Sequence, residues 1–515
     1  MDQESDGRQD VWMAVGLFVL TVISRIPFRS RILYHWDSVN FAYAMREFSV
    51  AKEQPQPPGY IVYVWLCRLV DLLFHDAQAT MVWISIVASA LAVVALFYLG
   101  RSMFNRQTGL LAALFLGFSP LFWFYGEIAL PHTLDALLVI VSAWWLYETM
   151  RGDHRYLYPA IAVMAVAGGV RQQTIIFLAP LLLFALRRVG WKRFLVAGAL
   201  GALACLAWFV PLMALSGGLS NYIRVMGEFS RRFQSTTSVF MGAGWRGVVY
   251  NMRKLAMYTL YGWSVALVPG VIQMISATSR LCRCRWPKQW EGSLYVFLWI
   301  APALIFYTIV HMGQQGLIFV FLPALSLISA VGSMRLLIAR SRWLVGMGIA
   351  LVVLNVSIFC LTPEYPLGPG TQRLLTCSTL VNSDHYYQDR FRVIEENFAP
   401  ESTAILAINW HHVEYYLPQY VRLPFYVGEE KEGDEGNPKG SPYEVVATPD
   451  NLGLQFDSSG RVAIVAFDSD LMVFRDSAGS MYELPLKHGG RVAYFVLKRG
   501  EAFHYGAYSF GVVED

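Results

Sequence analysis

The chain has 515 residues and a formal net charge of +4, with 55% hydrophobic residues, 15% charged residues and a mean hydropathy of +0.41. Soluble globular proteins contain about 45–50% apolar and about 25% charged residues. This shortage of charge argues against a cytosolic enzyme, a disordered scaffold or a nucleic-acid-binding protein.

The small net charge is the sum of two unequal parts. Residues 1–361 contain 29 Lys and Arg against 15 Asp and Glu, a balance of +14. Residues 362–515 contain 12 Lys and Arg against 22 Asp and Glu, a balance of −10. We therefore predict two physically different domains, a membrane domain over residues 1–361 and a water-soluble domain over residues 362–515.

Repeated apolar runs in residues 1–361 are long enough to cross a bilayer, which takes about 20 residues. The runs are 11–28, 79–100, 108–125, 128–149, 194–215, 255–278, 294–311, 316–338 and 343–361, with a shorter pair, 157–169 and 173–186, joined at Arg171. They predict an α-helical polytopic membrane protein with about eleven transmembrane helices. The run 58–75 is ambiguous, because Arg68 and Asp71 interrupt it.

The orientation follows from the Lys and Arg clusters, because cytoplasmic loops have an excess of these residues. The clusters are Arg101/Arg106, Arg151/Arg155, Arg187/Arg188/Lys192/Arg193, Arg280/Arg283/Arg285/Lys288 and Arg335/Arg340/Arg342. If residues 58–75 do not cross the membrane, the clusters fall after every second span and can all lie on the cytoplasmic side. Only the acidic N-terminal tail opposes this orientation. We predict a cytoplasmic N-terminus, a C-terminal domain in the periplasm or outside the cell, and a bacterial inner membrane.

The soluble part has a mixed pattern of secondary structure. Short β-like runs occur at Thr403–Ile408, Val462–Phe467 and Val492–Leu497, with helix-like stretches between them. This pattern predicts an α+β domain. The acidic, glycine-rich segment Gly428–Gly440 is expected to be an exposed loop.

Two features of this part leave alternatives open. His411, His412 and Glu414 could bind a metal, but no second cluster has ligand spacing, so a helix start with a polar patch is the favoured interpretation. Cys360 and Cys377 both lie near the predicted outer face, where a disulfide can form. The sequence does not decide whether they pair.

Ionisable residues in a membrane region are candidates for function, because their burial is expensive. Under the predicted topology, polar residues from separate loops reach the same outer face, with Asp135 one helical turn deeper. These residues are His35, Asp37, Glu53, Glu127, His132, Arg171, His311, Gln314 and Gln315. Their gathering predicts a polar cavity on the outer side of the membrane.

Asp37 and Arg171 are the most informative members of this group, and each has a structural alternative. A carboxylate at position 37 could take a proton from an acceptor hydroxyl as a general base, or it could cap a helix that begins there. Arg171 could hold a lipid-linked phosphate in bidentate geometry, or it could extend from a helix end toward the membrane surface.

The order of these motifs resembles that of the GT-C superfamily of polytopic glycosyltransferases. The motifs are a first helix that ends in RIP, a loop with HWDS, then PPGY, GEIALPHTLD and HMGQQGLIFVFLPAL. The nearest branch contains protein O-mannosyltransferases and the aminoarabinose transferases of lipid A. The resemblance covers most of residues 10–340, and the residues after 361 match no known pattern.

The resemblance implies roles for the acidic residues. Members of the superfamily have an acidic residue in the first outer loop that is taken as the catalytic base, and Asp37 occupies that place. In the aminoarabinose transferases a Glu lines the site shortly before a proline pair, which makes Glu53, ahead of Pro57-Pro58, the nearest candidate. The second site carboxylate is assigned to Glu127, because the aligned position in ALPH is His132.

The resemblance also implies positions for the donor's phosphate. The basic residue after the fifth helix of these enzymes corresponds to Arg171. Their late polar turn corresponds to the segment from His311 through Gln314 and Gln315, but the frequent Arg-Tyr pair is replaced here by Gly316-Leu317. Such enzymes use a polyprenyl-phosphate sugar as donor, and many work without a metal.

We therefore predict a membrane glycosyltransferase that moves a sugar from a polyprenyl-phosphate donor to an acceptor hydroxyl on the extracytoplasmic face, with inversion of configuration. Its partners are expected to be this donor, membrane lipids and an acceptor protein, lipid or glycan, with no nucleic acid and no metal or other cofactor. One alternative is a transporter or flippase, which internal repeats and helices broken at the midplane would favour. Another is a receptor whose acidic tail is the working part.

Overall fold

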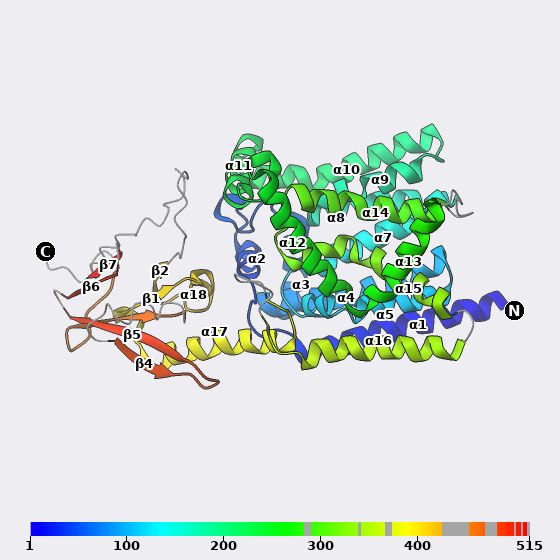
Figure 1. Cartoon of the computed structure of the whole chain (residues 1–515). Helices are drawn as coiled ribbons and strands as arrows, with labels where there is room; N and C mark the ends of the chain where they lie inside the picture. Colours follow the sequence, from blue (N-terminus) through cyan, green and yellow to red (C-terminus); the bar gives the residue numbers. More distant parts are fainter. Residues whose placement is uncertain are drawn as a thin grey trace. The chain divides into compact units, whose positions relative to one another are not determined.

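The computed structural model describes residues 2–282, 290–337, 341–365, 373–424, 453–468, 481–498, 501–505 and 508–511. Contacts divide the chain into two compact units (Figure 1). The first unit contains Met1–Arg31 and Asn40–Val381, and the second contains Ile32–Val39 and Asn382–Asp515. The first unit ends at Val381, after the predicted boundary at 361. The sequence did not predict that residues 32–39 belong to the second unit.

The first unit is helical. Its helices are α1 (Asp2–Arg25), α2 (Trp36–Arg46), α3 (Ile61–Phe74), α4 (Ala77–Met103), α5 (Arg106–Gly117), α6 (Pro120–Tyr125), α7 (His132–Met150), α8 (Leu157–Val170), α9 (Gln172–Leu186), α10 (Trp191–Leu215), α11 (Leu219–Gln234), α12 (Gly244–Trp263), α13 (Leu267–Cys282), α14 (Trp290–Ile309), α15 (Leu322–Leu337) and α16 (Ser341–Leu361). The first residues of α2 lie in the second unit, and α17 (Cys377–Asn397) runs from the first unit into the second.

Among the described residues, five helical stretches are long and apolar enough to cross a membrane. They are Gly7–Phe28, Ala77–Met103, Trp191–Leu215, Gly244–Ser279 and Trp290–Ile309, and shorter apolar helices cover Gln172–Leu186, Leu322–Leu336 and Gly348–Leu361. The predicted fold class is confirmed: a polytopic helical membrane domain is followed by a soluble domain with a mixed sheet.

One part of the predicted topology needs correction: the predicted single span 255–278 is divided between α12 and α13 at Ser264, whose φ is 50°. Residues 216–254, which the sequence allows to be an outer loop or an amphipathic helix on the lipid headgroups, contain α11 and the first turns of α12. In α11, exposed apolar residues such as Ile223 alternate with arginines such as Arg224. Such a helix is amphipathic and fits an interface better than a bilayer core.

The ambiguous run 58–75 forms α3, a helix of 14 residues. At 1.5 Å per residue this helix is roughly 21 Å long, which is less than the hydrocarbon core of a bilayer. The two polar residues that interrupt the run have local partners. The Arg68 guanidinium donates to the carbonyls of Ala44 and Met45 at the end of α2, and Asp71 accepts from Thr80 Oγ1.

One acidic residue of the N-terminal tail pairs directly with the first basic cluster. Asp10, which is 2% exposed, lies 2.7 Å from Arg101 Nη2 and 2.6 Å from Arg106 Nε. This part of α1 therefore lies beside the junction of α4 and α5.

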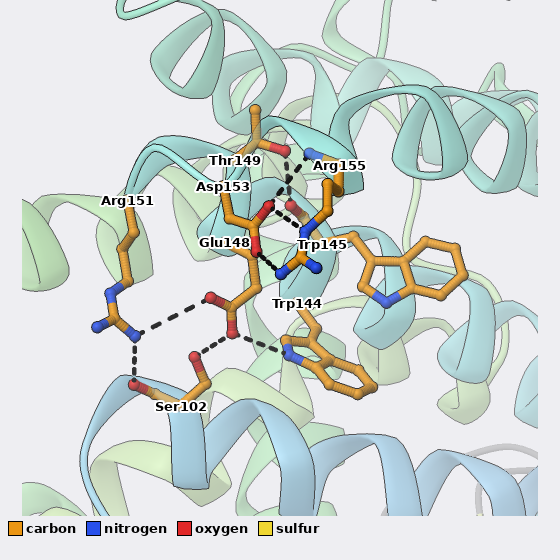
Figure 2. A network of polar contacts seen from close by, with 8 residues as sticks. All are labelled: Ser102, Trp144, Trp145, Glu148, Thr149, Arg151, Asp153 and Arg155. Carbon is orange, nitrogen blue, oxygen red and sulfur yellow. Dashed lines mark hydrogen bonds and ion pairs between the residues drawn. The ribbon is translucent and has the colours of Figure 1, made fainter.

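The second predicted cluster, Arg151 and Arg155, is joined to the end of α4 at Ser102, which follows Arg101 of the first cluster (Figure 2). Arg151 Nη1 donates to the carbonyl of Ser102 at 3.3 Å, and Glu148 accepts from the Ser102 hydroxyl and from Trp144 Nε1. These bonds join the ends of α4 and α7. Arg155 pairs with Asp153 in the turn that follows.

The second unit contains a five-stranded sheet with the order β2-β1-β3-β5-β4. Its strands are β1 (Thr403–Ala407), β2 (Val421–Pro424), β3 (Arg461–Ala466), β4 (Met481–Pro485) and β5 (Arg491–Lys498), with a separate hairpin of β6 (Ala502–Tyr505) and β7 (Tyr508–Gly511). β1 is parallel to β2 and β3, whereas β5 is antiparallel to β3 and β4. The three predicted β-like runs are β1, β3 and β5, and the predicted loop Gly428–Gly440 lies outside the described residues.

The core of this unit includes residues from the beginning of the chain. All five residues of β1 are buried, as expected of a central strand covered on both faces. On one face, residues of α17 and α18 (Trp410–Tyr416) pack against the sheet, and Ile32 packs with Tyr387 and Phe391 in the same cluster. The segment Ile32–Val39 is thus part of the second unit's core.

The structure describes the residues of both features of the soluble part that left alternatives open. His412 Nε2 lies 2.7 Å from the Leu33 carbonyl oxygen, and Glu414 pairs with Arg422. In the described ranges, no group of three or more His, Cys, Asp and Glu side chains could hold a metal ion. Cys360 and Cys377 are both free thiols.

We predict that His412 makes the second unit less stable as the pH falls. Burial lowers the pKa of His412 to about 3, whereas the unfolded chain has the ordinary value near 6.5. Between these values the unfolded chain binds a proton that the folded chain does not. Stability should therefore fall from about pH 6.5 toward pH 3, by up to about 1.4 kcal/mol per pH unit from this group.

The measurement is proteolysis of the full-length protein in detergent at increasing urea concentration, repeated from pH 7.5 to pH 4.5. His412→Gln removes this titration and should lose less stability than the wild type over the same range. Equal pH dependence of the two proteins would show that His412 does not contribute.

Candidate functional site

Arg171 occupies the break between two helices, as predicted. α8 ends at Val170 and α9 begins at Gln172, while Arg171 itself has an extended backbone, with φ −153° and ψ 109°. Its side chain is not directed toward the membrane surface, because the residue is only 8% exposed. The alternative of a helix-end arginine that extends to the surface is therefore wrong.

The Arg171 side chain is held by two groups inside the bundle. Its Nη1 lies 3.5 Å from Asp135 Oδ2, and its Nη2 donates to the Tyr307 hydroxyl at 3.2 Å. Asp135 also accepts from Thr174 Oγ1 at 2.7 Å. The network joins α7, α9 and α14, and it supplies each buried charge with a partner, as a low-dielectric interior requires.

A small pocket with a cavity volume of about 10 Å³ opens on this network. It is lined by Tyr60, Pro131, His132, Asp135, Val170 and Arg171. His132 is the first residue of α7, so the pocket lies at the positive end of that helix dipole. A guanidinium beside a helix N-terminus is an arrangement suited to an anion.

The proline-rich segment before α3 is tied to the same region. The Tyr222 hydroxyl donates to the Pro58 carbonyl at 3.0 Å, and Gln172 Nε2 donates to the Tyr222 hydroxyl at 2.9 Å. Tyr60, which follows in the chain, has a φ of 42° and lines the pocket. The segment is thus fixed to α9 and α11.

The predicted late turn contacts the pocket through a glycine. His311 Nδ1 lies 3.0 Å from Thr237 Oγ1, and Gln315 Nε2 donates to the Arg373 carbonyl at 2.9 Å. Gln314 directly precedes the short helix η6 (Gln315–Val320). A Cβ on Gly316 would lie 2.5 Å from His132 Cδ2. This contact leaves no room for the larger residue that the family pattern places in the turn.

Glu127 lies elsewhere in the first unit. It is fully buried, and its backbone carbonyl accepts from the Ser30 N–H at 2.9 Å. The charged neighbour of its carboxylate is Arg25. Glu127 is not part of the pocket lining. Its assignment as the second catalytic carboxylate stays a prediction.

Glu53 pairs with Arg232 of α11 rather than with Arg171. It follows the short helix η2 (Val50–Lys52), and its side chain is 23% exposed. The ion pair joins the first outer loop to the amphipathic helix. A role for Glu53 in substrate binding stays a prediction.

Asp37 and His35 belong to the second unit. The Asp37 carboxylate is 15% exposed, with His35 Nδ1 3.7 Å from its Oδ2. Because α2 begins at Trp36, Asp37 lies in the first helical turn and not at the N-cap. That Asp37 shares one cavity with Arg171 stays a prediction.

Tyr60, Thr174 and Tyr307 also hold or line the pocket and were not among the predicted site residues. Asp135, expected one helical turn deeper than the outer-face residues, contacts Arg171 directly. A signal existed for Asp135, because it follows His132 by three residues and so lies on the same helix face. No local signal identifies Tyr307, whose position relative to Arg171 depends on the packing of α14 against α9.

Comparisons with known proteins agree with this architecture. Residues 55–214 match the family model of dolichyl-phosphate-mannose-protein mannosyltransferases. The structure is similar to that of ArnT from Cupriavidus metallidurans bound to undecaprenyl phosphate, with a TM-score of 0.56 and 14% identity over 96% of this chain and 98% of that chain. It is also similar to the oligosaccharyltransferase of Archaeoglobus fulgidus, with a TM-score of 0.52 and 11% identity over 89% of this chain and 69% of that chain.

No curated protein sequence matches the chain. The fold is nevertheless similar to those of ArnT and the archaeal oligosaccharyltransferase, and the predicted resemblance to the GT-C superfamily is confirmed. The similarity to ArnT extends over nearly the whole chain, including the residues after 361 that matched no known sequence pattern.

We predict that Asp135→Ala destabilises the first unit by about 3 kcal/mol or more, because it leaves the Arg171 charge buried without its partner. Thermal unfolding in detergent measures the effect. The control is Glu228→Ala, which breaks the exposed Arg224–Glu228 pair on α11 and should change stability by no more than about 1 kcal/mol. Equal losses of stability from the two substitutions would show that the buried pair contributes no more to stability than the exposed pair.

Proposed function

We propose that this protein is an integral membrane glycosyltransferase that transfers a sugar from a polyprenyl-phosphate donor to an acceptor hydroxyl. The observation that carries the proposal is the pocket at Arg171, where a buried guanidinium and the N-terminus of α7 converge. The likeness of the whole fold to ArnT, which was solved with undecaprenyl phosphate, supports the same class of donor.

The donor's phosphate would bind at Arg171, with its isoprenoid tail in the lipid. Asp135 and Tyr307 hold the guanidinium in place before the substrate arrives. A positive group fixed in this way stabilises the charge that develops on a departing phosphate, and it needs no rearrangement during the reaction. His132 would contact the same phosphate or the sugar, because it lines the pocket at the first residue of α7.

Asp37 would act as the general base. Its carboxylate would take the proton from the acceptor hydroxyl while that oxygen forms a bond to the anomeric carbon of the sugar. The bond between this carbon and the phosphate oxygen breaks, and polyprenyl phosphate leaves with the bonding electron pair. A single displacement of this kind inverts the configuration and needs no nucleophile from the protein.

We propose that the reaction takes place on the extracytoplasmic face of a bacterial inner membrane. Two basic clusters support this orientation, because Arg101, Arg106 and Arg151 lie at one end of the bundle near the start of α1. The positive-inside rule assigns that end to the cytoplasm. The acceptor would be a hydroxyl of a protein, lipid or glycan, and the proposed displacement needs no metal.

We predict that Asp37→Asn lowers the rate of sugar transfer at least about 100-fold, because an amide cannot accept the proton. Purified protein would be supplied with undecaprenyl-phosphate hexoses and pentoses, and released undecaprenyl phosphate would be measured. Glu47→Gln is the matched control, because it removes another carboxylate from the same loop. The Glu47 side chain is 64% exposed and pairs with Lys52.

Donor binding by Asp37→Asn should stay within about twofold of the wild type. Transfer at the wild-type rate by Asp37→Asn would refute the general-base assignment. Movement of the donor across reconstituted vesicles without release of undecaprenyl phosphate would instead support the transporter alternative.

A double substitution separates the binding role of Arg171 from its structural role. Asp135→Leu combined with Arg171→Met removes both charges, and replacement of a buried ion pair by apolar residues of similar size is often neutral for stability. We predict that this variant folds as stably as the wild type but binds the donor at least about tenfold more weakly. Unchanged donor affinity, measured by titration with undecaprenyl-phosphate sugar, would remove Arg171 from the binding site.

A further inference from the structure

The second unit holds the backbone of the first outer loop through three side chains. The Leu33 carbonyl oxygen lies 2.7 Å from His412 Nε2, and the Leu33 N–H donates to the Tyr416 hydroxyl at 3.0 Å. The Ile32 N–H donates to Asp384 Oδ1 at 3.2 Å. The three side chains come from α17 and α18, more than 340 residues away along the chain. We call this set of contacts the loop clamp.

The arrangement of α18 suits it to hold one short stretch of backbone. His412 and Tyr416 are four residues apart, so their side chains lie on the same face of the helix. Because a carbonyl only accepts, His412 Nε2 must be the protonated nitrogen. The His412 ring is stacked on Tyr387 with a centroid distance of 4.3 Å, which fixes its orientation.

The clamped backbone is inaccessible to water. Leu33 is fully buried and Ile32 is 6% exposed. A buried N–H or carbonyl group without a partner costs free energy, so these bonds are needed for the loop to keep its path. A further contact follows in the same loop, where the Trp36 ring lies 5.7 Å from that of His411, edge to face.

The clamp lies directly before the candidate base. α2 begins at Trp36, and Asp37 is its second residue. The first turn of α2 therefore starts three residues after the clamped Leu33. The backbone that leads into this turn is fixed by α17 and α18, whereas the later residues of α2 belong to the first unit.

We propose that the C-terminal domain positions Asp37 for catalysis, with Asp384, His412 and Tyr416 as positioning residues that act through the backbone of Ile32 and Leu33. This inference rests on the proposed role of Asp37 as general base. It gives the C-terminal domain a part in the reaction that does not require it to touch the donor. A misplacement of about 1 Å at a reacting group can lower a rate about 100-fold, so small losses of order in this loop matter.

The test uses the full-length protein and two readouts. The clamp variant combines His412→Leu with Tyr416→Phe, which removes both partners of Leu33 and leaves the Asp37 side chain unchanged. Hydrogen–deuterium exchange of peptides that cover residues 32–39 reports on the clamp itself. Steady-state transfer of sugar from undecaprenyl-phosphate donors reports on its effect, as separate values of kcat and of KM for the donor.

Tyr420→Phe is the matched control. The Tyr420 hydroxyl donates to the Phe398 carbonyl at 2.8 Å, in the same unit and with no bond to the loop. His412→Gln is the conservative variant, because its amide can still donate to the Leu33 carbonyl. Urea midpoints of all variants show whether the second unit remains folded.

We expect at least tenfold faster exchange in residues 32–39 of the clamp variant and a fall in kcat of about 10- to 100-fold, with KM for the donor within about twofold of the wild type. Tyr420→Phe should change neither the exchange in residues 32–39 nor kcat. His412→Gln should retain most of the wild-type kcat. Unchanged exchange in residues 32–39 would overturn the clamp. Faster exchange with an unchanged kcat, in an enzyme that Asp37→Asn inactivates, would overturn the positioning role.

Failure of the proposed function gives a different result. If Asp37→Asn transfers sugar at the wild-type rate, Asp37 is not the base and the positioning role falls with it. If the wild type transfers no sugar from any donor, the glycosyltransferase proposal is refuted, and the positioning role with it. The exchange measurement still decides whether α18 holds the loop.

Discussion

A positive charge inside an apolar helix bundle needs a partner, and the arrangement of the first unit around Arg171 follows from this constraint. Arg171 lies at the break between α8 and α9. Its guanidinium is paired with the Asp135 carboxylate of α7 and the Tyr307 hydroxyl of α14. Desolvation of an unpaired guanidinium would cost several kcal/mol. The packing of α7, α9 and α14 is therefore determined in part by a charge that also lines the pocket.

This constraint explains which parts of the fold could be predicted. Spans and basic clusters depend on local composition, so the sequence predicted the break at Arg171 and the common end of the first two basic clusters. For residues 216–254 the sequence admitted both an outer loop and an amphipathic helix, because the apolar residues of α11 are not contiguous. Long-range pairings have no local pattern, and for that reason the pairing of Asp10 with Arg101 and Arg106 could not be predicted.

The candidate site was predicted in part, for the same physical reason. Arg171 and His132 line one pocket, as expected from their placement on the outer side. Glu127 was assigned as the second carboxylate because the aligned position is His132 and Glu127 is the acidic residue shortly before it, yet its side chain is fully buried near Arg25. Helix packing decides which carboxylate pairs with a buried arginine. No spacing rule tells Glu127, in the loop before α7, from Asp135, eight residues later in α7.

The loop clamp has a consequence for variation in sequence. His412, Tyr416 and Asp384 bond to main-chain groups of Ile32 and Leu33, and these groups are the same for every residue type except proline, which has no N–H. The loop side chains are therefore free to change without loss of the hydrogen bonds, whereas their partners are not. Related enzymes could alter this loop to suit new acceptors while the residues that orient it stay fixed in a distant domain.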